Sequence, residues 1–249
     1  SGECSSRSDL TLPDAQRDLL AALEKTGKPI VLVYFSGRST VMTWENEHIP
    51  AILNVWFGGS EAGDAICDVL FGDRVPGGRL VTSMPKSTGQ LPLYYNHLNT
   101  GRPERQWFSK FRSNFLDVDN DPLFPFGYGL SYTTFSYGEV RLDRHTLHEG
   151  GKITAAVDVT NTGAYDADEV VQLYIRDVAG SVSRPVKELK GFRRISLKRG
   201  ETKTVSFDVT TDDLRFYNAD LDYVYEPGEF ELMIGRNSAD VQTVRFSLE

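Results

Sequence analysis

The sequence predicts an α/β fold followed by an all-β fold. Up to about residue 120, continuous apolar runs alternate with segments of helical period, the arrangement typical of an α/β layer fold. From about residue 137, apolar residues recur at every second position in short runs separated by turns, as expected of an antiparallel β-sandwich. We therefore divide the chain into an α/β part (1–120), a joint (121–136) and a β-sandwich part (137–249).

The joint is rich in residues that exclude a helix and a flexible linker. Pro122 and Pro125 fix φ, while Gly127 and Gly129 allow backbone turns that other residues avoid. Aromatic side chains are too frequent here for a solvated linker. The joint should therefore be ordered and packed between two bodies.

The first part predicts two helices and three strands. Residues 14–23 have an acidic first turn and amphipathic spacing, and Gly27 ends this helix. Residues 29–35 and 51–57 are apolar and rich in β-branched residues, as expected of parallel strands covered on both faces. The remaining elements are a helix at 61–71 and a short strand at 80–82.

Composition excludes several classes of protein. The 249 residues carry a formal charge of −8, which argues against nucleic acid as a partner because phosphate binding needs clustered basic residues. No apolar run reaches the roughly 18 residues needed to span a membrane. Two cysteines, Cys4 and Cys67, cannot form a disulfide framework, and we expect free thiols. No signal peptide is visible, and the start at Ser1 without an initiator Met indicates a fragment.

Two candidate ligand sites have simpler explanations. The turn at 57–63 joins a strand to a helix N-terminus, a place that often holds phosphate, but it lacks a nucleotide-binding glycine pattern and Glu61 adds negative charge. Tight packing of strand on helix explains its glycines. His145 and His148 are three residues apart in a predicted loop without the carboxylates of a zinc site, so no metal site is predicted.

Aromatic residues also gather late in the first part. Residues 90–103 combine tyrosines, amides and turn residues, and Trp107, Phe108, Phe111 and Phe115 follow. Long aromatic loops often serve binding, and sugar rings stack on such side chains. The alternative is that these aromatics wrap the sheet, and both interpretations stay open.

The second part predicts about seven short strands of a sandwich of the immunoglobulin or fibronectin type III kind. The inward positions are Ile153, Ala155, Val157, Val159, Val171, Leu173, Ile175, Val205, Phe207, Val209, Phe230, Leu232 and Ile234. Turns are expected at 161–163, 198–201 and 226–229. The acidic residues fall mainly on outward positions or in turns, where they form a solvated face.

Six strings, taken in order, resemble the C-terminal part of family 3 glycoside hydrolases, most closely the bacterial periplasmic β-glucosidases. They are GKPIVLV (27–33), WFGGSEAG (56–63), DVLFGD (68–73), PGGRL (76–80), PFGYGLSY (125–132) and RPVKELKGF (184–192). The resemblance covers essentially the whole chain. It implies an incomplete α/β sandwich domain, truncated at its N-terminus, followed by a fibronectin type III-like β-sandwich, with the family's preceding (β/α)8 barrel absent.

The resemblance also implies a retaining mechanism that uses a nucleophile and an acid/base about 5 Å apart. In the family the nucleophile is an aspartate of the barrel, whereas the acid/base is a glutamate in a loop that runs into an arginine and a Leu-x-Leu-Pro string. Residues 3–13 match that loop, so the resemblance assigns Glu3 as acid/base and Arg7 as its neighbour. Arg7 and Trp107 are loop candidates for substrate contact, and the other substrate-binding residues are unknown.

By resemblance, the parent protein is an exo-acting β-glucosidase that hydrolyses terminal non-reducing β-D-glucosyl residues, is periplasmic or secreted, and needs no cofactor or metal. Its expected partners are an oligosaccharide substrate and the missing barrel portion, and a homodimer stays open. β-Xylosidase or exo-glucanase activity of the same family is an alternative. A different class, a non-catalytic carbohydrate-binding or assembly module, would use the aromatic loop at 94–115.

Further expectations follow for this chain. Without the nucleophile and most of the glucose pocket it should be inactive, and Glu3 should titrate as a surface glutamate near its ordinary pKa of about 4.3. The resemblance places the joint at the seam between the two domains. Tyr128 and Tyr132 should then be largely buried, and Gly127 or Gly129 should have a positive φ.

Overall fold

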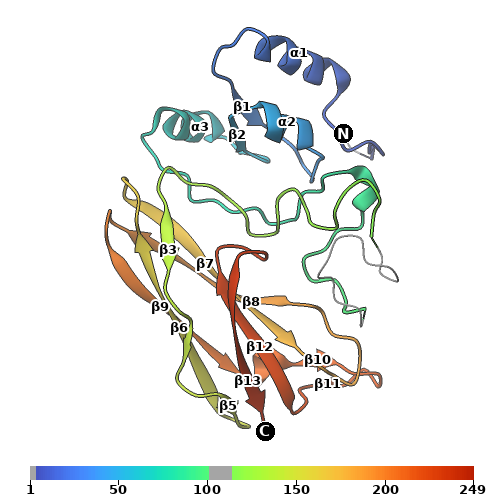
Figure 1. Ribbon diagram of the computed structural model, residues 1–249, viewed down its shortest axis with the longest axis vertical. Helices are drawn as coiled ribbons and strands as arrows, with labels where there is room; N and C mark the ends of the chain where they lie inside the picture. The colour runs from blue at the N-terminus through green and yellow to red at the C-terminus, as the bar shows by residue number, and fades with distance from the viewer. Residues whose placement is uncertain (1–3, 101–113) are drawn as a thin grey trace. The chain divides into compact units, whose positions relative to one another are not determined.

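The computed structural model describes residues 4–100 and 114–249, which fall into two compact units (Figure 1). We name them the α/β unit and the β-sandwich unit. The α/β unit comprises Ser1–Asp73, Thr82–Leu93 and Gln106–Pro125. The β-sandwich unit comprises Arg74–Val81, Tyr94–Arg105 and Phe126–Glu249, so two segments from the first half of the sequence belong to it.

In the part of the chain that the structure describes, the α/β unit contains three helices, a 3-10 turn and a two-stranded parallel sheet. In chain order the elements are α1 (Asp14–Glu24), β1 (Val31–Tyr34), α2 (Thr43–His48), β2 (Ala51–Asn54), α3 (Ala62–Phe71) and η1 (Thr88–Gln90). β1 and β2 pair in parallel with Val31 opposite Ala51. The predicted helices at 14–23 and 61–71 and the first two strands are confirmed, whereas α2 was not predicted.

Local sequence explains where the helices of this unit end. Gly72 follows α3 with φ 86° and closes it with a hydrogen bond from its N–H to the carbonyl of Val69. Only glycine adopts this left-handed conformation without strain. Gly27, at φ 67°, ends the α1 turn in the same manner.

Burial in the α/β unit departs from the prediction of strands covered on both faces. β2 ends at Asn54, and Phe57, which we placed in the strand, is 87% exposed. Val31 in β1 is also exposed. None of the residues of α3 is buried, and the apolar Phe71 at its end is 81% exposed. The reason is that two strands and three helices cannot cover both faces of the sheet. The predicted strand at 80–82 is absent, because this segment makes only two backbone hydrogen bonds at Leu80 rather than a ladder.

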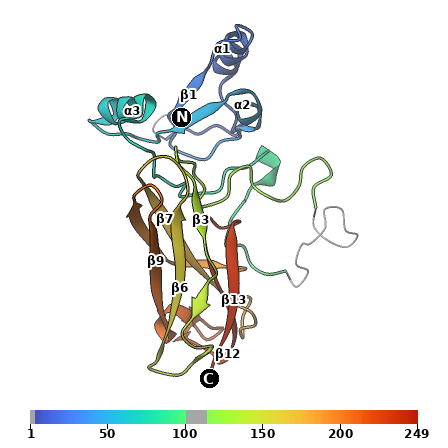
Figure 2. The same cartoon turned by 60° about the vertical axis from the view of Figure 1, so that its left-hand side comes forward.

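The β-sandwich unit is built from eleven strands of the described residues, arranged in two main sheets and a hairpin (Figure 2). The strands are β3 (Phe135–Tyr137), β4 (Arg141–Leu142), β5 (Thr146–Leu147), β6 (Lys152–Asn161), β7 (Ala167–Asp177), β8 (Glu188–Leu197), β9 (Thr202–Thr210), β10 (Phe216–Tyr217), β11 (Tyr223–Val224), β12 (Gly228–Gly235) and β13 (Val241–Leu248). A 3-10 turn, η2 (Thr211–Leu214), follows β9.

The two main sheets of this unit are almost entirely antiparallel. One has the order β5-β13-β12-β7-β8, and the other has the order β3-β6-β4 with β9 paired to β6. Among the described strands of these two sheets, only β5 and β13 pair in parallel. The remaining pair, β10 and β11, forms a short antiparallel hairpin.

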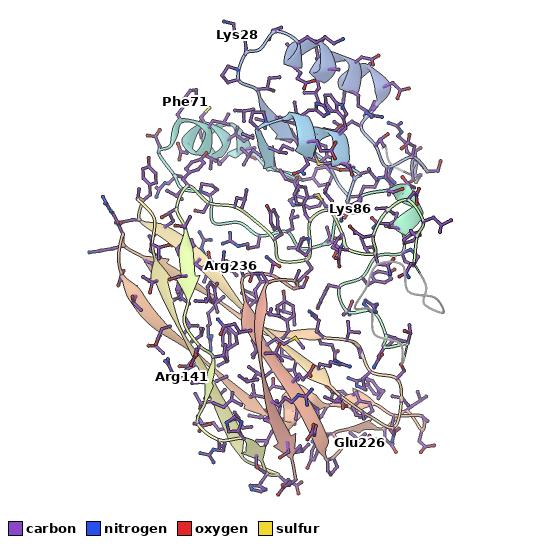
Figure 3. The ribbon with its side chains drawn as sticks, viewed as in Figure 1. Lys28, Phe71, Lys86, Arg141, Glu226 and Arg236 are labelled. Atoms are coloured by element: carbon purple, nitrogen blue, oxygen red, sulfur yellow. The ribbon has the colours of Figure 1, made fainter. Side chains whose placement is uncertain are left out.

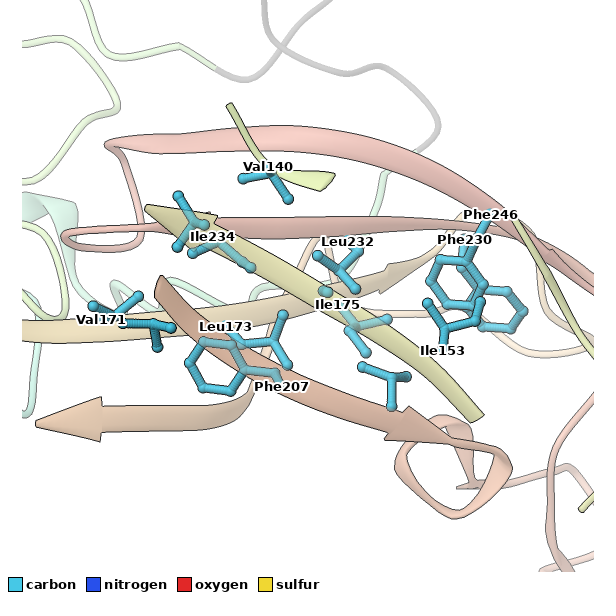
Figure 4. Packing of buried hydrophobic residues seen from close by; sticks show 14 of the residues in the cluster. Val140, Ile153, Val171, Leu173, Ile175, Phe207, Phe230, Leu232, Ile234 and Phe246 are labelled. Atoms are coloured by element: carbon cyan, nitrogen blue, oxygen red, sulfur yellow. The ribbon is translucent and has the colours of Figure 1, made fainter. Parts of the chain in front are cut away.

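The core of this unit lies between the two sheets (Figure 4). The predicted alternation is confirmed, since every inward residue named from the sequence is buried, as Ile153 of β6, Val171 of β7 and Phe230 of β12 illustrate. Figure 4 shows these side chains directed toward one another from both sheets. Period-two patterning therefore placed the second part of the chain correctly.

The joint is ordered, and its residues from Phe126 onward are part of the β-sandwich unit. It pairs with the segment Arg74–Val81, which we name the strap: Leu80 N–H donates to the Tyr128 carbonyl, and Gly127 N–H donates to the Leu80 carbonyl, each over 2.8 Å. A Cβ at Gly129 would lie 2.5 Å from the carbonyl oxygen of Gly78. These glycines let the two backbones approach closely.

Two of the three expectations for individual joint residues need correction or qualification. Gly127 has φ 81°, as predicted. Tyr128 is only half-buried, and Tyr132 is 46% exposed, so the prediction of burial is wrong for Tyr132. The reason is local: just before β3 begins at Phe135, the buried Thr133 donates a hydrogen bond to Asn161, and the neighbouring Tyr132 faces outward.

Candidate active site

The predicted acid/base, Glu3, and the candidate Trp107 lie outside the described residues. The structure does place the loop that follows Glu3, from Cys4 to Pro13, including Arg7. Arg7 is exposed. The site can therefore be built from this loop, and the roles of Glu3, Arg7 and Trp107 remain predictions.

The loop after Glu3 is anchored inside the α/β unit by its apolar residues and two hydrogen bonds. Leu10 and Leu12 are buried. The Val41 N–H donates to the Leu10 carbonyl over 3.0 Å, and the Arg38 guanidinium donates to the Ser6 hydroxyl over 2.8 Å. The loop is thus fixed to the connection between β1 and α2 at two points on either side of residue 7.

A local turn stiffens the middle of this loop. One Asp9 carboxylate oxygen accepts hydrogen bonds from the Thr11 N–H (2.9 Å) and the Thr11 hydroxyl (2.8 Å). These two bonds, with smaller contributions from the charges of Arg7 and Arg17, hold the pKa of Asp9 below its ordinary value. The same two hydrogen bonds hold the turn closed and so fix the course of the chain after Arg7.

The glycine-rich turn before α3 fits the packing interpretation. A Cβ at Gly58 would lie 2.5 Å from the Cβ of Ala62, so only glycine fits where the strand meets the helix. Glu61 precedes the helix as an exposed carboxylate, without a side-chain hydrogen bond to the helix terminus. The features that argued against phosphate binding are all present here.

The cysteines and histidines do not assemble into a metal site in the part of the chain that the structure describes. Cys4 and Cys67 are exposed free thiols. No group of three or more potential ligands comes together among residues 4–100 and 114–249. His145 makes a hydrogen bond of 2.9 Å between its Nδ1 and the Arg245 carbonyl. Within the same ranges, no helix has the length and apolar character to cross a membrane.

In the described part of the aromatic loop, one tyrosine fits the packing interpretation and its neighbour fits the binding interpretation. The Tyr95 ring stacks on Phe126 with centroids 4.3 Å apart and meets the buried Tyr174 ring edge-on at 5.9 Å. The Tyr95 hydroxyl accepts a hydrogen bond from the Leu189 N–H. Tyr94 is exposed. One tyrosine therefore covers the outer face of β7, and its neighbour is free to contact solvent or a ligand.

Sequence reasoning missed a buried charged cluster in the β-sandwich unit. Glu169 of β7 accepts a hydrogen bond from the Arg79 guanidinium of the strap at 2.6 Å, with side-chain exposures of 1% and 9%. Its other oxygen accepts from the Tyr137 hydroxyl at 2.8 Å. Arg236, labelled in Figure 3, lies with its guanidinium carbon 5.8 Å from the centre of the Tyr137 ring. The expectation of a solvated acidic face is wrong at Glu169.

The electrostatics of Glu169 are dominated by burial. Loss of hydration raises its pKa above the ordinary value, opposed by the positive charge of Arg79 and the hydrogen bond from Tyr137. Burial and the neighbouring carboxylate raise the pKa of Tyr137 as well, so its hydroxyl stays protonated and donates. A signal was present in the sequence, because Glu169 is in phase with Val171 and Leu173 on the inward side of β7.

The fold and the six strings quoted from the sequence agree with one class of protein. Residues 1–132 match the glycosyl hydrolase family 3 C-terminal domain, and residues 169–238 match the fibronectin type III-like domain. The chain therefore belongs to glycoside hydrolase family 3, and its fold is an α/β domain followed by a fibronectin type III-like β-sandwich.

Individual relatives show which enzymes of the family this chain is similar to. A periplasmic β-glucosidase of Salmonella typhimurium is 51% identical over 99% of this chain and 32% of its own length, and a β-xylosidase of Formosa agariphila is 46% identical over 100% and 34%. A β-glucosidase from Listeria innocua, solved in complex with glucose, superposes with a TM-score of 0.94 at 40% identity, over 100% of this chain and 34% of that protein. This chain thus spans about a third of the length of these relatives.

Proposed function

We propose that this chain is the C-terminal portion of a retaining, exo-acting β-glucosidase that is periplasmic or secreted, with Glu3 as its acid/base. The observation that supports the proposal most strongly is 51% identity to a periplasmic β-glucosidase across 99% of the chain. In this role Glu3 protonates the leaving oxygen and then deprotonates the attacking water. A barrel elsewhere in the protein supplies the nucleophile.

The burial pattern of the α/β unit also supports membership of a larger body. Parallel sheets are normally covered on both faces, and a two-stranded sheet is marginally stable by itself. Here Val31, Phe35 and Phe57 are exposed around a sheet of only two strands. Further strands or helices of the parent protein would cover them, which is the arrangement the proposal requires.

Hydrolysis of p-nitrophenyl β-D-glucoside tests the proposal. The chain alone should release no p-nitrophenol above background, whereas mixing it with the separately produced N-terminal portion should restore turnover. Glu3→Gln should abolish hydrolysis of unactivated cello-oligosaccharides in the mixture, and Glu61→Gln, at an exposed glutamate of the same unit, should leave it intact. Appreciable turnover of p-nitrophenyl β-D-glucoside by the chain alone would refute the proposal. Full activity of the Glu3→Gln mixture on cello-oligosaccharides would refute it as well.

The same assay separates the related activities of the family. The relatives include β-xylosidases as well as β-glucosidases, so p-nitrophenyl β-D-xyloside and a longer β-glucan are tested beside the glucoside. Preference for the xyloside would assign the parent protein as a β-xylosidase. Release of glucose from the polymer end would assign it as an exo-glucanase.

A non-catalytic carbohydrate-binding role is the second candidate, favoured by the exposed ring of Tyr94. Exposed aromatic rings offer an apolar face on which sugars stack. Calorimetric titration with cello-oligosaccharides tests it: binding at millimolar affinity or tighter by the isolated chain, lost in Tyr94→Ala and kept in Tyr165→Ala, supports this role. The absence of heat beyond dilution would remove it.

A further inference from the structure

The backbone has an unusual conformation directly after the proposed acid/base. Cys4 has φ 56°, in the left-handed region that is uncommon for residues other than glycine. A residue keeps such a conformation only where its surroundings impose it, and residues of this kind cluster at functional sites. The chain therefore turns at residue 4, and the contacts of the next few residues fix the direction in which it runs.

Arg38 supplies the contact that holds the loop just beyond this turn. Its guanidinium donates a hydrogen bond of 2.8 Å to the Ser6 hydroxyl. Residues 4–9 are all exposed, so burial does not fix them, and the first buried residue is Leu10. Within the described ranges, the bond from Arg38 is the one hydrogen bond that joins residues 4–9 to the rest of the α/β unit.

Arg38 is itself held in place by the connection between β1 and α2. The Ser36 hydroxyl donates to the Arg38 carbonyl over 2.8 Å and accepts from the Arg38 N–H over 3.2 Å, which closes a local turn. The hydroxyls of Tyr34 and Thr40, both buried, form a hydrogen bond of 2.8 Å across the same connection. A side chain supported in this way is preorganised to hold another segment.

We propose that Arg38 is a positioning residue for the acid/base, because by holding Ser6 it fixes the backbone from which the Glu3 carboxyl reaches the leaving oxygen. This role rests on the proposed function of Glu3. Only Cys4 and Ser5 separate Glu3 from Ser6 in the sequence, so a hold on Ser6 limits the movement of the backbone at residue 3. A general acid must lie within hydrogen-bond reach of the leaving oxygen, and a misplacement of about 1 Å can cost about 100-fold in rate.

Leaving-group dependence in the mixture with the N-terminal portion tests this role. Protonation by the acid is needed for the alcohol leaving group of cellobiose, but hardly for the dinitrophenolate of 2,4-dinitrophenyl β-D-glucoside. Arg38→Met keeps the aliphatic stem and loses the donors, so it should lower kcat/KM for cellobiose by about 10–100-fold and for the dinitrophenyl glucoside by less than about twofold.

A second variant removes the other partner of the same bond. Ser6→Ala should reproduce the selective loss on cellobiose, and the double variant with Arg38→Met should lose no more than either single variant. Ser8→Ala, at another exposed serine of the loop, is the matched control and should change neither rate.

The possible failures are distinguishable. An equal loss on both substrates would overturn the positioning role, because a merely structural role lowers both rates alike. Unchanged kcat/KM for cellobiose in Arg38→Met would overturn it too. A wild-type mixture without activity would overturn the proposed function together with this role.

The order of the loop is measured on the 249-residue chain alone by ¹⁵N relaxation. We expect the backbone amide of Ser6 to have an order parameter of about 0.85 in the wild-type chain and below about 0.6 in Arg38→Met. Leu10 is the internal control and should stay ordered, since its burial and the hydrogen bond from Val41 remain. A Ser6 amide that is equally ordered in both chains would overturn the positioning role.

Discussion

Replacing Arg79 by methionine should destabilise the β-sandwich unit far more than the loss of an ordinary surface arginine. The guanidinium of Arg79 donates to Glu169 at 2.6 Å, and both side chains are almost fully buried. Methionine fills similar space but leaves the Glu169 carboxylate in the core with only the hydroxyl of Tyr137 as a partner. The carboxylate must then remain ionised without its cation or take up a proton.

The expected magnitude follows from the burial of the pair. Removing one partner of a buried ion pair typically costs about 3–5 kcal/mol, because the remaining charge is uncompensated. For a chain of this size each kcal/mol lowers Tm by about 2–4 °C, so Arg79→Met should lower the melting temperature of this unit by about 6–20 °C. Thermal unfolding followed by near-ultraviolet circular dichroism measures this directly.

A double-mutant cycle isolates the interaction. Glu169→Gln removes the buried negative charge and still accepts the hydrogen bond from Tyr137. The double variant should therefore be more stable than Arg79→Met alone by at least about 2 kcal/mol. Additive effects of the two substitutions would refute the reasoning. Arg194→Met, which breaks the neighbouring solvent-accessible pair with Asp168, should cost less than about 1 kcal/mol.

The pH dependence gives an independent check of the same pair. Because burial raises the folded-state pKa of Glu169, its contribution to stability is present below the ordinary pKa of 4.5 and is lost as pH rises through the folded value. Arg79→Met removes the charge that opposes this shift, so the folded pKa rises further. The deficit of the variant should therefore be small at pH 4.5 and grow toward pH 7.5; a deficit that is constant with pH would contradict this account.

Three other substitutions probe two glycines and one buried amide of the same unit. Gly127→Ala should cost about 2–4 kcal/mol in urea unfolding, since alanine is strained at φ 81° and its Cβ would collide with the amide of Gln172. Gly200→Ala, at φ 75° with open space around it, should cost only about 1 kcal/mol, and equal costs would show that the collision is relieved. Asn161→Ala should cost about 1–3 kcal/mol, because the fully buried amide bonds the Thr133 hydroxyl and two backbone carbonyls; a change below about 0.5 kcal/mol would contradict its role.

The β-sandwich was predictable because its core is made by its own strands. Ile153, Val171 and Phe230 each sit at an inward position whose partners are other inward positions of the same unit, so the period of two and the burial agree. Glu169 departs from the prediction because its partner Arg79 lies 90 residues away in sequence. Alternation identifies an inward position, but it does not reveal a cation delivered from a distant segment.

The α/β part was predictable in its elements but not in its burial. The apolar run ending at Phe57 predicts a covered strand, yet the covering groups are not provided by the two strands and three helices of this unit. Residues 80–82 have strand propensity but form no strand. The strap is instead held by a close backbone contact at glycines and by the ion pair of Arg79 with Glu169, and residue propensities do not predict such contacts. For the site, the sequence supplied the motif that contains Glu3, the proposed acid/base, whereas the hydrogen bonds that anchor the following loop to Arg38 and Val41 depend on three-dimensional packing and left no pattern in the chain.

Because the strap and the joint supply partners for buried residues of the β-sandwich, this domain cannot be moved into another protein as its strands alone. A β-sandwich excised at residue 137 would retain Glu169 and Gln172 in its interior while losing Arg79 and the carbonyl of Gly127, which are their partners. Chimaeras that graft this module as one continuous block of sequence would thus carry into a new host a buried carboxylate without its cation and a buried glutamine amide with one hydrogen bond fewer, although Tyr137, Tyr174 and Arg236 would still bond them. The structural unit is built from separate segments of the sequence. A transferred β-sandwich must therefore include the strap, Tyr95 and the joint, or the recipient protein must already provide equivalent residues.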